Sequence, residues 1–238
     1  MLKVFVDFDN TVTVGDLGDA LFLHFGGEAC AQYDAQYKDG LLTAKECLTK
    51  KCEACGFVDR SRLDDFLRSQ RVDSTFSDFV RFCEGRRVTL AIVSDGLDYY
   101  IDTVLRQQGW EHVPSFSNAV RFAGTGDGVR MVPTFPHDDE VCTRCACCKR
   151  NIMLSHSGDE DILVYVGDGY SDRCPAGYAD IVFAKGELQP YCQEENISYY
   201  EFRSFRDVQT RLETILGYAR LRKRREAEKK RRALFMAG

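Results

Sequence analysis

Two carboxylates follow an apolar run near the beginning of the sequence. Residues 4–6 are Val, Phe and Val; Asp7 and Asp9 come next, with Thr11 two positions further on. Alternate residues of a strand point to the same side, so Asp7 and Asp9 should share a side for as long as the strand continues. Two carboxylates this close repel one another unless a positive charge lies between them. A hard divalent cation such as Mg²⁺ takes oxygen ligands and leaves positions for a phosphate, so the spacing predicts a magnesium site that binds phosphate.

Two later apolar runs also end in polar residues. Residues 91–93 lead into Ser94 and Gly96, which are a small hydroxyl residue and a residue whose backbone can approach an anion closely. Residues 163–166 lead into Asp168, which has a glycine on each side. In open α/β sheets ligands bind at the carboxyl ends of the strands, so we expect these groups to meet at one edge of a sheet.

One lysine fits the same chemistry. Lys149 follows a group of cysteines and precedes an apolar stretch, residues 152–154, that is typical of a helix. A phosphoryl group in transfer spreads negative charge over its oxygens, and stabilising that charge is most of the catalysis. An anionic carboxylate cannot approach such a group unless cations screen both. Mg²⁺ and Lys149 would supply that screen, which indicates phosphoryl transfer.

The order carboxylate, hydroxyl, lysine, carboxylate resembles the haloacid dehalogenase superfamily of phosphohydrolases, over motifs that extend from Asp7 to Asp172. The resemblance implies that Asp7 is the nucleophile and becomes an aspartyl-phosphate. It implies that Asp9 is the general acid for the leaving alcohol and then the general base for water. Lys149 would neutralise charge on the nucleophile and on the group in transfer.

The same resemblance assigns binding roles to the remaining motif residues. The implied phosphate-binding residues are Thr11, Ser94, Gly96 and Lys149. The implied ligands of Mg²⁺ are Asp7, Asp168 and the main-chain carbonyl of Asp9. Asp172 would anchor Lys149 or a metal-bound water.

Helical segments separate the first strand from the rest of the motifs. Apolar spacing and glycine breaks predict helices at residues 16–25, 29–37, 43–55 and 60–69. Thr43 and Asp59 are suitable N-caps for the last two. An insertion here resembles the phosphoserine-phosphatase-like branch of the superfamily, and such a cap would exclude water and select the substrate. Asp16 matches a position where that branch carries an acidic residue near the substrate amine, and it could equally cap the first of these helices.

The whole pattern predicts an α/β protein with a Rossmann-like, three-layer αβα core, a parallel sheet and an inserted helical-bundle cap. The expected division is a catalytic core at residues 1–13 and 78–210, the cap at residues 14–77, and a basic helical extension at residues 211–238. Residues 118–122 and 129–132 should form a hairpin, joined by a glycine-rich turn at residues 124–128.

Three segments resemble one group within that branch: the cysteine-rich segment before Lys149, residues 167–174 and residues 179–185. This group contains the methionine-salvage phosphatase acting on 2-hydroxy-3-keto-5-methylthiopentenyl-1-phosphate. Its neighbours are the phosphoserine and the phosphoethanolamine/phosphocholine phosphatases. The resemblance implies a Mg²⁺-dependent phosphomonoester hydrolase for a small phosphorylated metabolite of one of these types. The alternatives are a phosphotransferase or mutase of the same chemistry, or a non-catalytic zinc- or nucleic-acid-binding protein.

Eleven cysteines occur among the 238 residues. The chain has no run of 18 apolar residues and enters its first strand at once, so we expect a cytoplasmic protein with reduced thiols and no membrane segment. Cys52 with Cys55, and Cys142 with Cys145, have the spacing of zinc ligands and would form a structural site if the fold joined both pairs. Cysteines beside Lys149 could instead be reactive, since a nearby cation lowers the pKa of a thiol.

A basic segment lies near the end of the sequence. Residues 220–232 contain nine Lys or Arg residues against Glu226 and Glu228, a local charge of +7 that leaves −12 on the rest of the chain. Such a run can bind nucleic acid. We favour a solvated helical extension whose beginning is docked by Leu212, Ile215, Leu216 and Ala219. Contact between this segment and the acidic body of a second copy would give a homodimer in place of a monomer.

Overall fold

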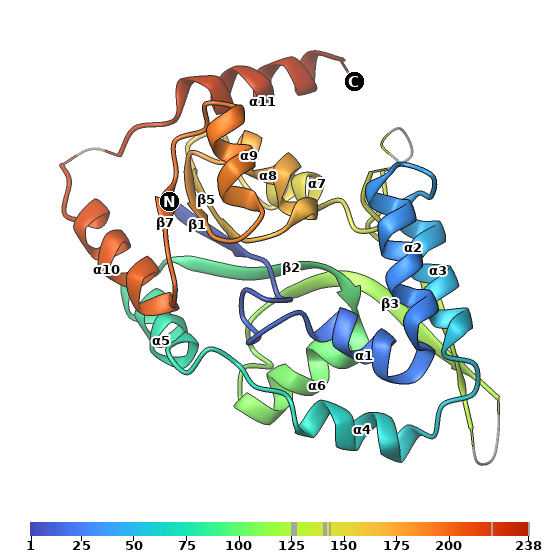
Figure 1. Ribbon diagram of the computed structural model, residues 1–238. Helices are drawn as coiled ribbons and strands as arrows, with labels where there is room; N and C mark the ends of the chain where they lie inside the picture. Colours follow the sequence, from blue (N-terminus) through green and yellow to red (C-terminus); the bar gives the residue numbers. More distant parts are fainter. Residues whose placement is uncertain (125–127, 140–141, 143, 220, 238) are drawn as a thin grey trace. The chain divides into compact units, whose positions relative to one another are not determined.

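The computed structural model describes residues 1–124, 128–139, 142, 144–219 and 221–237 (Figure 1). The chain forms two compact units, and each unit combines segments that are distant in the sequence. The first unit comprises Met1–Asp7, Val72–Ile92 and Lys149–Gly238, and the second comprises Phe8–Arg71 and Val93–Cys148. Among the described residues, the strands follow the sheet order β4-β3-β2-β1-β5-β6-β7.

Parallel strands form the sheet of the first unit. β1 (Leu2–Val6) pairs on one side with the first residues of β2 (Thr89–Leu97) and on the other side with β5 (Ile162–Gly167). β6 (Ile181–Ala184) pairs with β5, and β7 (Tyr200–Glu201) pairs with β6. Every residue of β5 is buried, as expected for a parallel strand that is covered on both faces.

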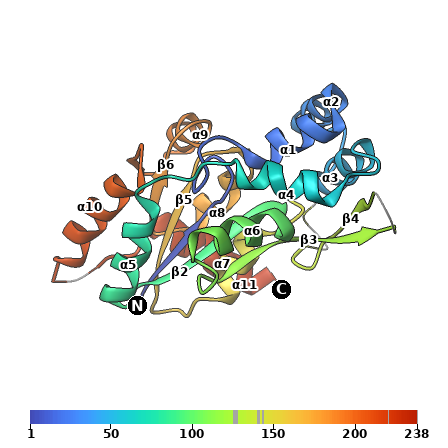
Figure 2. The ribbon, with the colours of Figure 1, turned by 90° about the horizontal axis from the view of Figure 1, so that it is seen from below.

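Helices surround this sheet. The described α-helices of the first unit are α5 (Phe76–Arg86), α7 (Lys149–Ser155), α8 (Arg173–Tyr178), α9 (Leu188–Glu194), α10 (Phe205–Leu216) and α11 (Arg225–Ala237). α5 and α10 lie side by side (Figure 2), with the ring centroids of Phe76 and Phe205 4.6 Å apart. Leu212 and Ile215 are buried as expected, whereas Leu216 is half-buried and Ala219 is exposed, so docking through Ala219 is not found.

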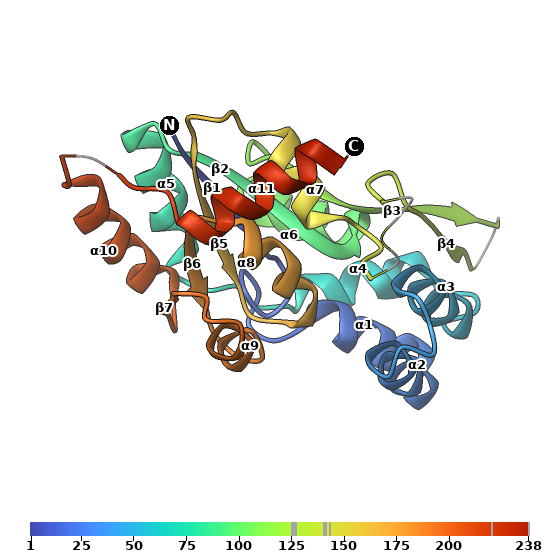
Figure 3. The same ribbon diagram turned by 90° about the horizontal axis from the view of Figure 1, so that it is seen from above.

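The basic segment ends in a helix whose described side chains are mostly exposed, as expected for a solvated extension, but one face of that helix is docked, which the sequence did not predict. α11 packs against α8 (Figure 3), and Ala227 is fully buried. The guanidinium of Arg231 donates to Asp180 Oδ1 at 2.8 Å, and the backbone N–H of Arg224 donates to the same oxygen at 3.0 Å. A buried carboxylate needs such partners, and here it fixes the helix on the first unit.

Helices dominate the second unit. The four helices expected before residue 70 are present as α1 (Leu17–Gly26), α2 (Glu28–Lys38), α3 (Ala44–Ala54) and α4 (Arg60–Arg68). Thr43 forms a capping box with Glu46, and Asp59 accepts from the N–H groups of Ser61 and Arg62. Both N-cap predictions are therefore confirmed.

The expected hairpin follows α6 (Asp98–Gln108). β3 (Ser115–Ala123) pairs with β4 (Arg130–Thr134) in antiparallel register. Positions 125–127 of the expected turn lie outside the described residues.

The parallel strands and their helices confirm the predicted α/β class. The division into core, cap and extension stays a prediction, because each compact unit combines segments from more than one of those parts. Within the described ranges, no helix has both the length and the apolar character that crossing a membrane requires.

Candidate active site

Three carboxylates and one ammonium group meet in the first unit. Asp7 directly follows β1, Asp168 directly follows β5, and Lys149 is the first residue of α7. Oxygens of Asp7, Asp168 and Asp172 lie within 4.8 Å of one another. Lys149 Nζ donates to Asp7 Oδ1 at 2.6 Å and to Asp172 Oδ1 at 2.7 Å, and all four side chains are buried. The first unit thus brings four of the predicted site residues together.

Strand register explains why the first two carboxylates converge. β1 and β5 are parallel neighbours in which Val6 lies opposite Val166. The backbone N–H of Asp7 continues the ladder by donating to Val166 O at 2.9 Å. Asp7 and Asp168 therefore leave the sheet at the same edge, at the carboxyl ends of adjacent strands, where sheets of this kind bind ligands.

Asp172 uses both of its oxygens within the protein. Oδ1 accepts from Lys149 and from the hydroxyl of Tyr165, the latter at 2.5 Å. Oδ2 accepts from the backbone N–H groups of Asp168 and Gly169 at 2.8 and 2.9 Å. A carboxylate offers about four acceptor positions, and four donors fill them here. Asp172 is therefore suited to hold Lys149 and the Asp168 backbone, which leaves the side chains of Asp7 and Asp168 to face a cation.

Burial and neighbouring charges oppose the ionisation of Asp7. Its pKa is raised well above the ordinary value by burial, then by Asp172 and Asp168, and Lys149 only partly opposes this rise. The pKa of Tyr165 is also raised, first by burial and then by Asp172, so its hydroxyl remains a donor. The cluster holds more negative than positive charge away from water, and a bound cation would correct that imbalance.

A second group of predicted residues meets around Asp9 in the second unit. Asp9 Oδ1 accepts from the backbone N–H of Gly18 at 3.0 Å, and Oδ2 accepts from the hydroxyl of Tyr100 at 2.8 Å. Ser94 Oγ lies 3.4 Å from the same Oδ2, and it accepts the backbone N–H of Gly96 at 2.9 Å. Asp9, Ser94 and Gly96 thus form one hydrogen-bonded group.

The loop after Asp9 turns sharply. Asn10 has a φ of +50°, in the left-handed region that asparagine tolerates better than most residues. Its backbone N–H donates to Thr13 Oγ1 at 3.0 Å. Thr11 is buried, and its backbone N–H donates to Phe8 O at 3.2 Å. These contacts fix the backbone that carries Asp9 and Thr11.

Asp16 is the N-cap of α1. Its side chain is exposed and accepts from the backbone N–H of Asp19 at 2.7 Å. This is the capping role that the sequence left open, and a role next to the substrate stays a prediction.

Sequence reasoning missed three hydroxyl groups in these clusters. Tyr165 and Ser171 contact the first cluster, the latter by accepting from Lys149 Nζ at 2.9 Å, and Tyr100 contacts Asp9. Ser171 adjoins Asp172 in a predicted motif, so proximity could have suggested it. The sequence around Tyr100 and Tyr165 does not identify them as site residues, because a tyrosine in an apolar stretch is equally expected as an ordinary core residue.

The cysteine pairs with zinc-ligand spacing do not come together. The described residues contain one group of His, Cys, Asp or Glu side chains that could hold a metal, namely the three carboxylates of the first unit. Cys52 and Cys55 are buried, and burial raises the pKa of each thiol to about 12. Thiols with such pKa values are protonated at neutral pH, which suits packing more than metal binding.

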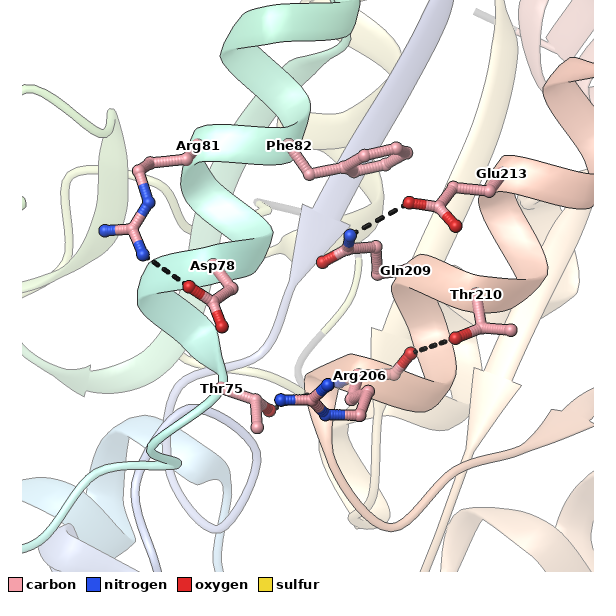
Figure 4. Close-up of a pocket in the computed structure, with 8 residues that line it drawn as sticks. All are labelled: Thr75, Asp78, Arg81, Phe82, Arg206, Gln209, Thr210 and Glu213. Atoms are coloured by element: carbon pink, nitrogen blue, oxygen red, sulfur yellow. Dashed lines mark hydrogen bonds and ion pairs between the residues drawn. The ribbon is translucent and has the colours of Figure 1, made fainter.

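A groove of about 510 Å³ lies between α5 and α10, and none of its lining residues belongs to either cluster (Figure 4). Arg81 pairs there with Asp78, and Gln209 donates to Glu213 at 2.9 Å. Because these polar groups already have partners and the groove is open, it is a weaker candidate than the carboxylate clusters.

Comparison with known proteins agrees with this geometry. A family model described as "Putative Phosphatase" matches residues 2–189. Two curated relatives are named 2-hydroxy-3-keto-5-methylthiopentenyl-1-phosphate phosphatase. One, from a strain of Bacillus cereus, is 25% identical, over 91% of this chain and 98% of its own length. The other, from Exiguobacterium sibiricum, is 28% identical, over 92% and 99%.

Solved structures show the same fold. A phospho-aspartyl intermediate analogue of phosphoserine phosphatase aligns with a TM-score of 0.66 at 18% identity, over 88% of this chain and 97% of that one. A substrate-bound phosphoserine phosphatase aligns with a TM-score of 0.64 at 18% identity, over the same shares. This likeness confirms the predicted Rossmann-like α/β fold.

Proposed function

The chain belongs to the family described as "Putative Phosphatase" and is a phosphatase of the haloacid dehalogenase type; from this premise we propose that it hydrolyses a small phosphomonoester with Mg²⁺, through an aspartyl-phosphate on Asp7. The observation that carries the proposal is the buried contact of Lys149 with Asp7 and Asp172, with Asp168 beside them. This arrangement gives a carboxylate nucleophile one fixed ammonium partner and leaves a second carboxylate available to a cation.

Two displacements at phosphorus make up the proposed reaction. An oxygen of Asp7 attacks phosphorus and forms the acyl-phosphate bond, while the bond to the alcohol oxygen breaks and Asp9 gives that oxygen a proton. Water then attacks the phosphorus of the aspartyl-phosphate and gives a proton to Asp9. The bond to Asp7 breaks, so inorganic phosphate leaves and both carboxyl groups return to their first state.

The other residues have positioning and binding roles in this proposal. Lys149 holds Asp7 Oδ1 and reduces the charge that opposes approach of the phosphate. Asp172 orients Lys149 through its 2.7 Å contact. The proposed donors to the phosphoryl oxygens are Thr11, Ser94 and Gly96.

The donor set of the first unit fits Mg²⁺. The three carboxylates are hard oxygen donors within 4.8 Å of one another, and four internal donors already engage Asp172. Asp7 and Asp168 would therefore hold the ion, and the main-chain carbonyl of Asp9 is the proposed third protein ligand. When bound, Mg²⁺ supplies positive charge that screens the substrate phosphate from the nucleophile.

For the substrate we propose 2-hydroxy-3-keto-5-methylthiopentenyl-1-phosphate, after the names of the curated relatives. Phosphoserine is the next candidate, after the names of the solved phosphoserine phosphatases that share the fold. The phosphoethanolamine or phosphocholine type follows, on the sequence resemblance alone. At 25–28% identity a phosphatase can keep its chemistry and change the residues that contact the alcohol part, so the substrate needs its own test.

Phosphate release from a panel of these esters, with Mg²⁺ or with EDTA, tests the proposal. We expect Mg²⁺-dependent release with one clear preference, and loss of turnover in Asp7→Asn with the fold retained. Asp168→Ala should require more Mg²⁺ for half-maximal activity. Turnover by Asp7→Asn close to the wild-type rate would show that Asp7 is not the nucleophile, and an unchanged Mg²⁺ requirement in Asp168→Ala would exclude the proposed ion site.

A further inference from the structure

Tyr100 contacts the proposed acid–base residue from within the core of the second unit. It lies in the first turn of α6, is only 2% exposed, and donates its hydroxyl to Asp9 Oδ2 at 2.8 Å. The other oxygen of Asp9 accepts from the backbone N–H of Gly18 at 3.0 Å. Two different helices therefore hold the two oxygens of one carboxylate, which fixes the plane of that group.

The space for this hydroxyl is made by two glycines. A Cβ atom on Gly96 would collide with Tyr100 Oη and come within 2.5 Å of Tyr100 Cζ. A Cβ atom on Gly18 would lie 2.9 Å from Tyr100 Oη but 3.6 Å from Cζ, so only the hydroxyl is too close there. The absence of a side chain at both glycines thus leaves the room in which the phenol oxygen reaches Asp9.

We propose that Tyr100 is a positioning residue for Asp9, a role that rests on the acid–base function proposed above. The phenol holds the carboxyl group in one orientation, so Asp9 transfers its proton along one direction to the leaving oxygen and later receives one from water. Small displacements of a reacting group cost large factors in rate, so a fixed carboxyl plane contributes directly to turnover. Phenylalanine at this position would keep the ring packing and lose the orientation.

The leaving-group dependence of turnover separates this role from a structural one. Phenyl phosphate and p-nitrophenyl phosphate have similar shapes, but the nitrophenolate needs less help from a general acid. For Tyr100→Phe we expect kcat/KM with phenyl phosphate to fall about 10- to 100-fold, the loss that a misplaced catalytic group causes. With p-nitrophenyl phosphate, kcat/KM of Tyr100→Phe should fall less than about threefold, because proton donation contributes less to the departure of nitrophenolate.

A neighbouring tyrosine provides the matched control. Tyr99 lies on the same helix and donates its hydroxyl to Asp64 instead of Asp9. Tyr99→Phe removes the same group and should affect the two substrates equally. Asp9→Asn is the reference for a missing general acid and should show the same substrate dependence as Tyr100→Phe, with larger losses.

A double-mutant cycle with Gly18→Ala tests the geometry independently. On the wild-type background the added methyl group meets the Tyr100 hydroxyl, so the loss with phenyl phosphate should resemble that of Tyr100→Phe. On the Tyr100→Phe background the hydroxyl is gone, and Gly18→Ala should add little further loss. If the losses in kcat/KM of Gly18→Ala and Tyr100→Phe were additive in the double variant, the proposed close approach of the Tyr100 hydroxyl to Gly18 would be wrong.

The outcomes distinguish this inference from the function on which it rests. If Asp9→Asn shows the leaving-group dependence but Tyr100→Phe behaves like Tyr99→Phe, the positioning role is wrong and the acid–base role stands. If Asp9→Asn reduces kcat/KM for both substrates equally, the general-acid role itself fails and the inference fails with it.

Discussion

Asp172→Asn is the substitution that most directly probes the first cluster. The buried carboxylate accepts from Lys149 and Tyr165 with one oxygen and from the N–H groups of Asp168 and Gly169 with the other. Asparagine has nearly the same shape, but one of its two polar atoms is an NH₂ group that cannot accept. In either orientation the amide nitrogen faces two donors, so two of the four hydrogen bonds are lost.

The cost follows from those two bonds. A buried donor left without its acceptor costs about 1–3 kcal/mol, so two donors give about 2–6 kcal/mol. Loss of one negative charge relieves the repulsion that raises the pKa of Asp7, which acts in the opposite direction. We therefore expect a net loss of about 2–3 kcal/mol in the free energy of unfolding, or a decrease in Tm of roughly 4–12 °C for a chain of this size.

Thermal unfolding in EDTA and phosphate release in Mg²⁺ measure the two consequences. We expect the lower Tm together with at least a tenfold decrease in kcat, since in either orientation of the amide Lys149 loses the negative charge that holds and orients it. Asp65→Asn is the control, because Asp65 is exposed and its removal should leave both quantities unchanged. A melting temperature within about 2 °C of wild type, with normal kcat, would refute the assignment of Asp172 as the anchor of Lys149.

Three further predictions concern charge, thiols and the C-terminal helix. Burial and neighbouring carboxylates raise the pKa of Asp7 above its unfolded value of about 4, so without divalent cations the folded state keeps that proton to higher pH than the unfolded state does. The Tm of the wild type should therefore fall as pH rises from 4 toward neutrality. Asp7→Asn has no proton to lose at this position and should abolish this decline in Tm. Burial raises the pKa of Cys52 to about 12, so iodoacetamide at pH 8 should label this thiol only after the protein is unfolded in urea. Mass spectrometry detects the label, and fast labelling of Cys52 in the native protein would contradict this prediction. Arg231→Met should lower the free energy of unfolding by about 1–3 kcal/mol, because Asp180 loses a charged donor. The control is Arg232→Met, which removes an exposed arginine and should cost less than about 0.5 kcal/mol. Equal values for the two variants in urea unfolding would argue against the docked helix.

The sequence was sufficient for the features that depend on local pattern. Apolar runs that end in polar residues predicted the strand ends that carry Asp7 and Asp168. The strand expected to end at Ser94 is longer than predicted, because β2 continues to Leu97. Turn and capping chemistry predicted the helix starts after Thr43 and Asp59, because those side chains satisfy N–H groups a few residues away. Such interactions involve near neighbours in the chain, so they can be read without knowing the fold.

Features that depend on distant segments could not be read in this way. The bond from Lys149 to Asp172 and the reach of Tyr100 to Asp9 exist only once elements that are separate in the chain have been placed. The same is true of the basic segment at residues 220–232, whose nine Lys or Arg residues suggested solvent exposure. One of them, Arg231, has its partner at Asp180, about fifty positions earlier, and no periodicity within the basic segment reveals that contact.

The central place of β1 has a consequence for how the chain folds as it is synthesised. β1 pairs with the start of β2 and with β5, and the second of these partners follows it by about 160 residues. At roughly 5–20 residues per second, the ribosome takes about 8–30 s to add that length of chain. Until then one edge of this apolar strand lacks a partner for its N–H and C=O groups, which favours aggregation or binding by a chaperone. The helices α1, α2 and α3 pack against one another and can form in that interval, before the nucleophile at the end of β1 reaches its lysine.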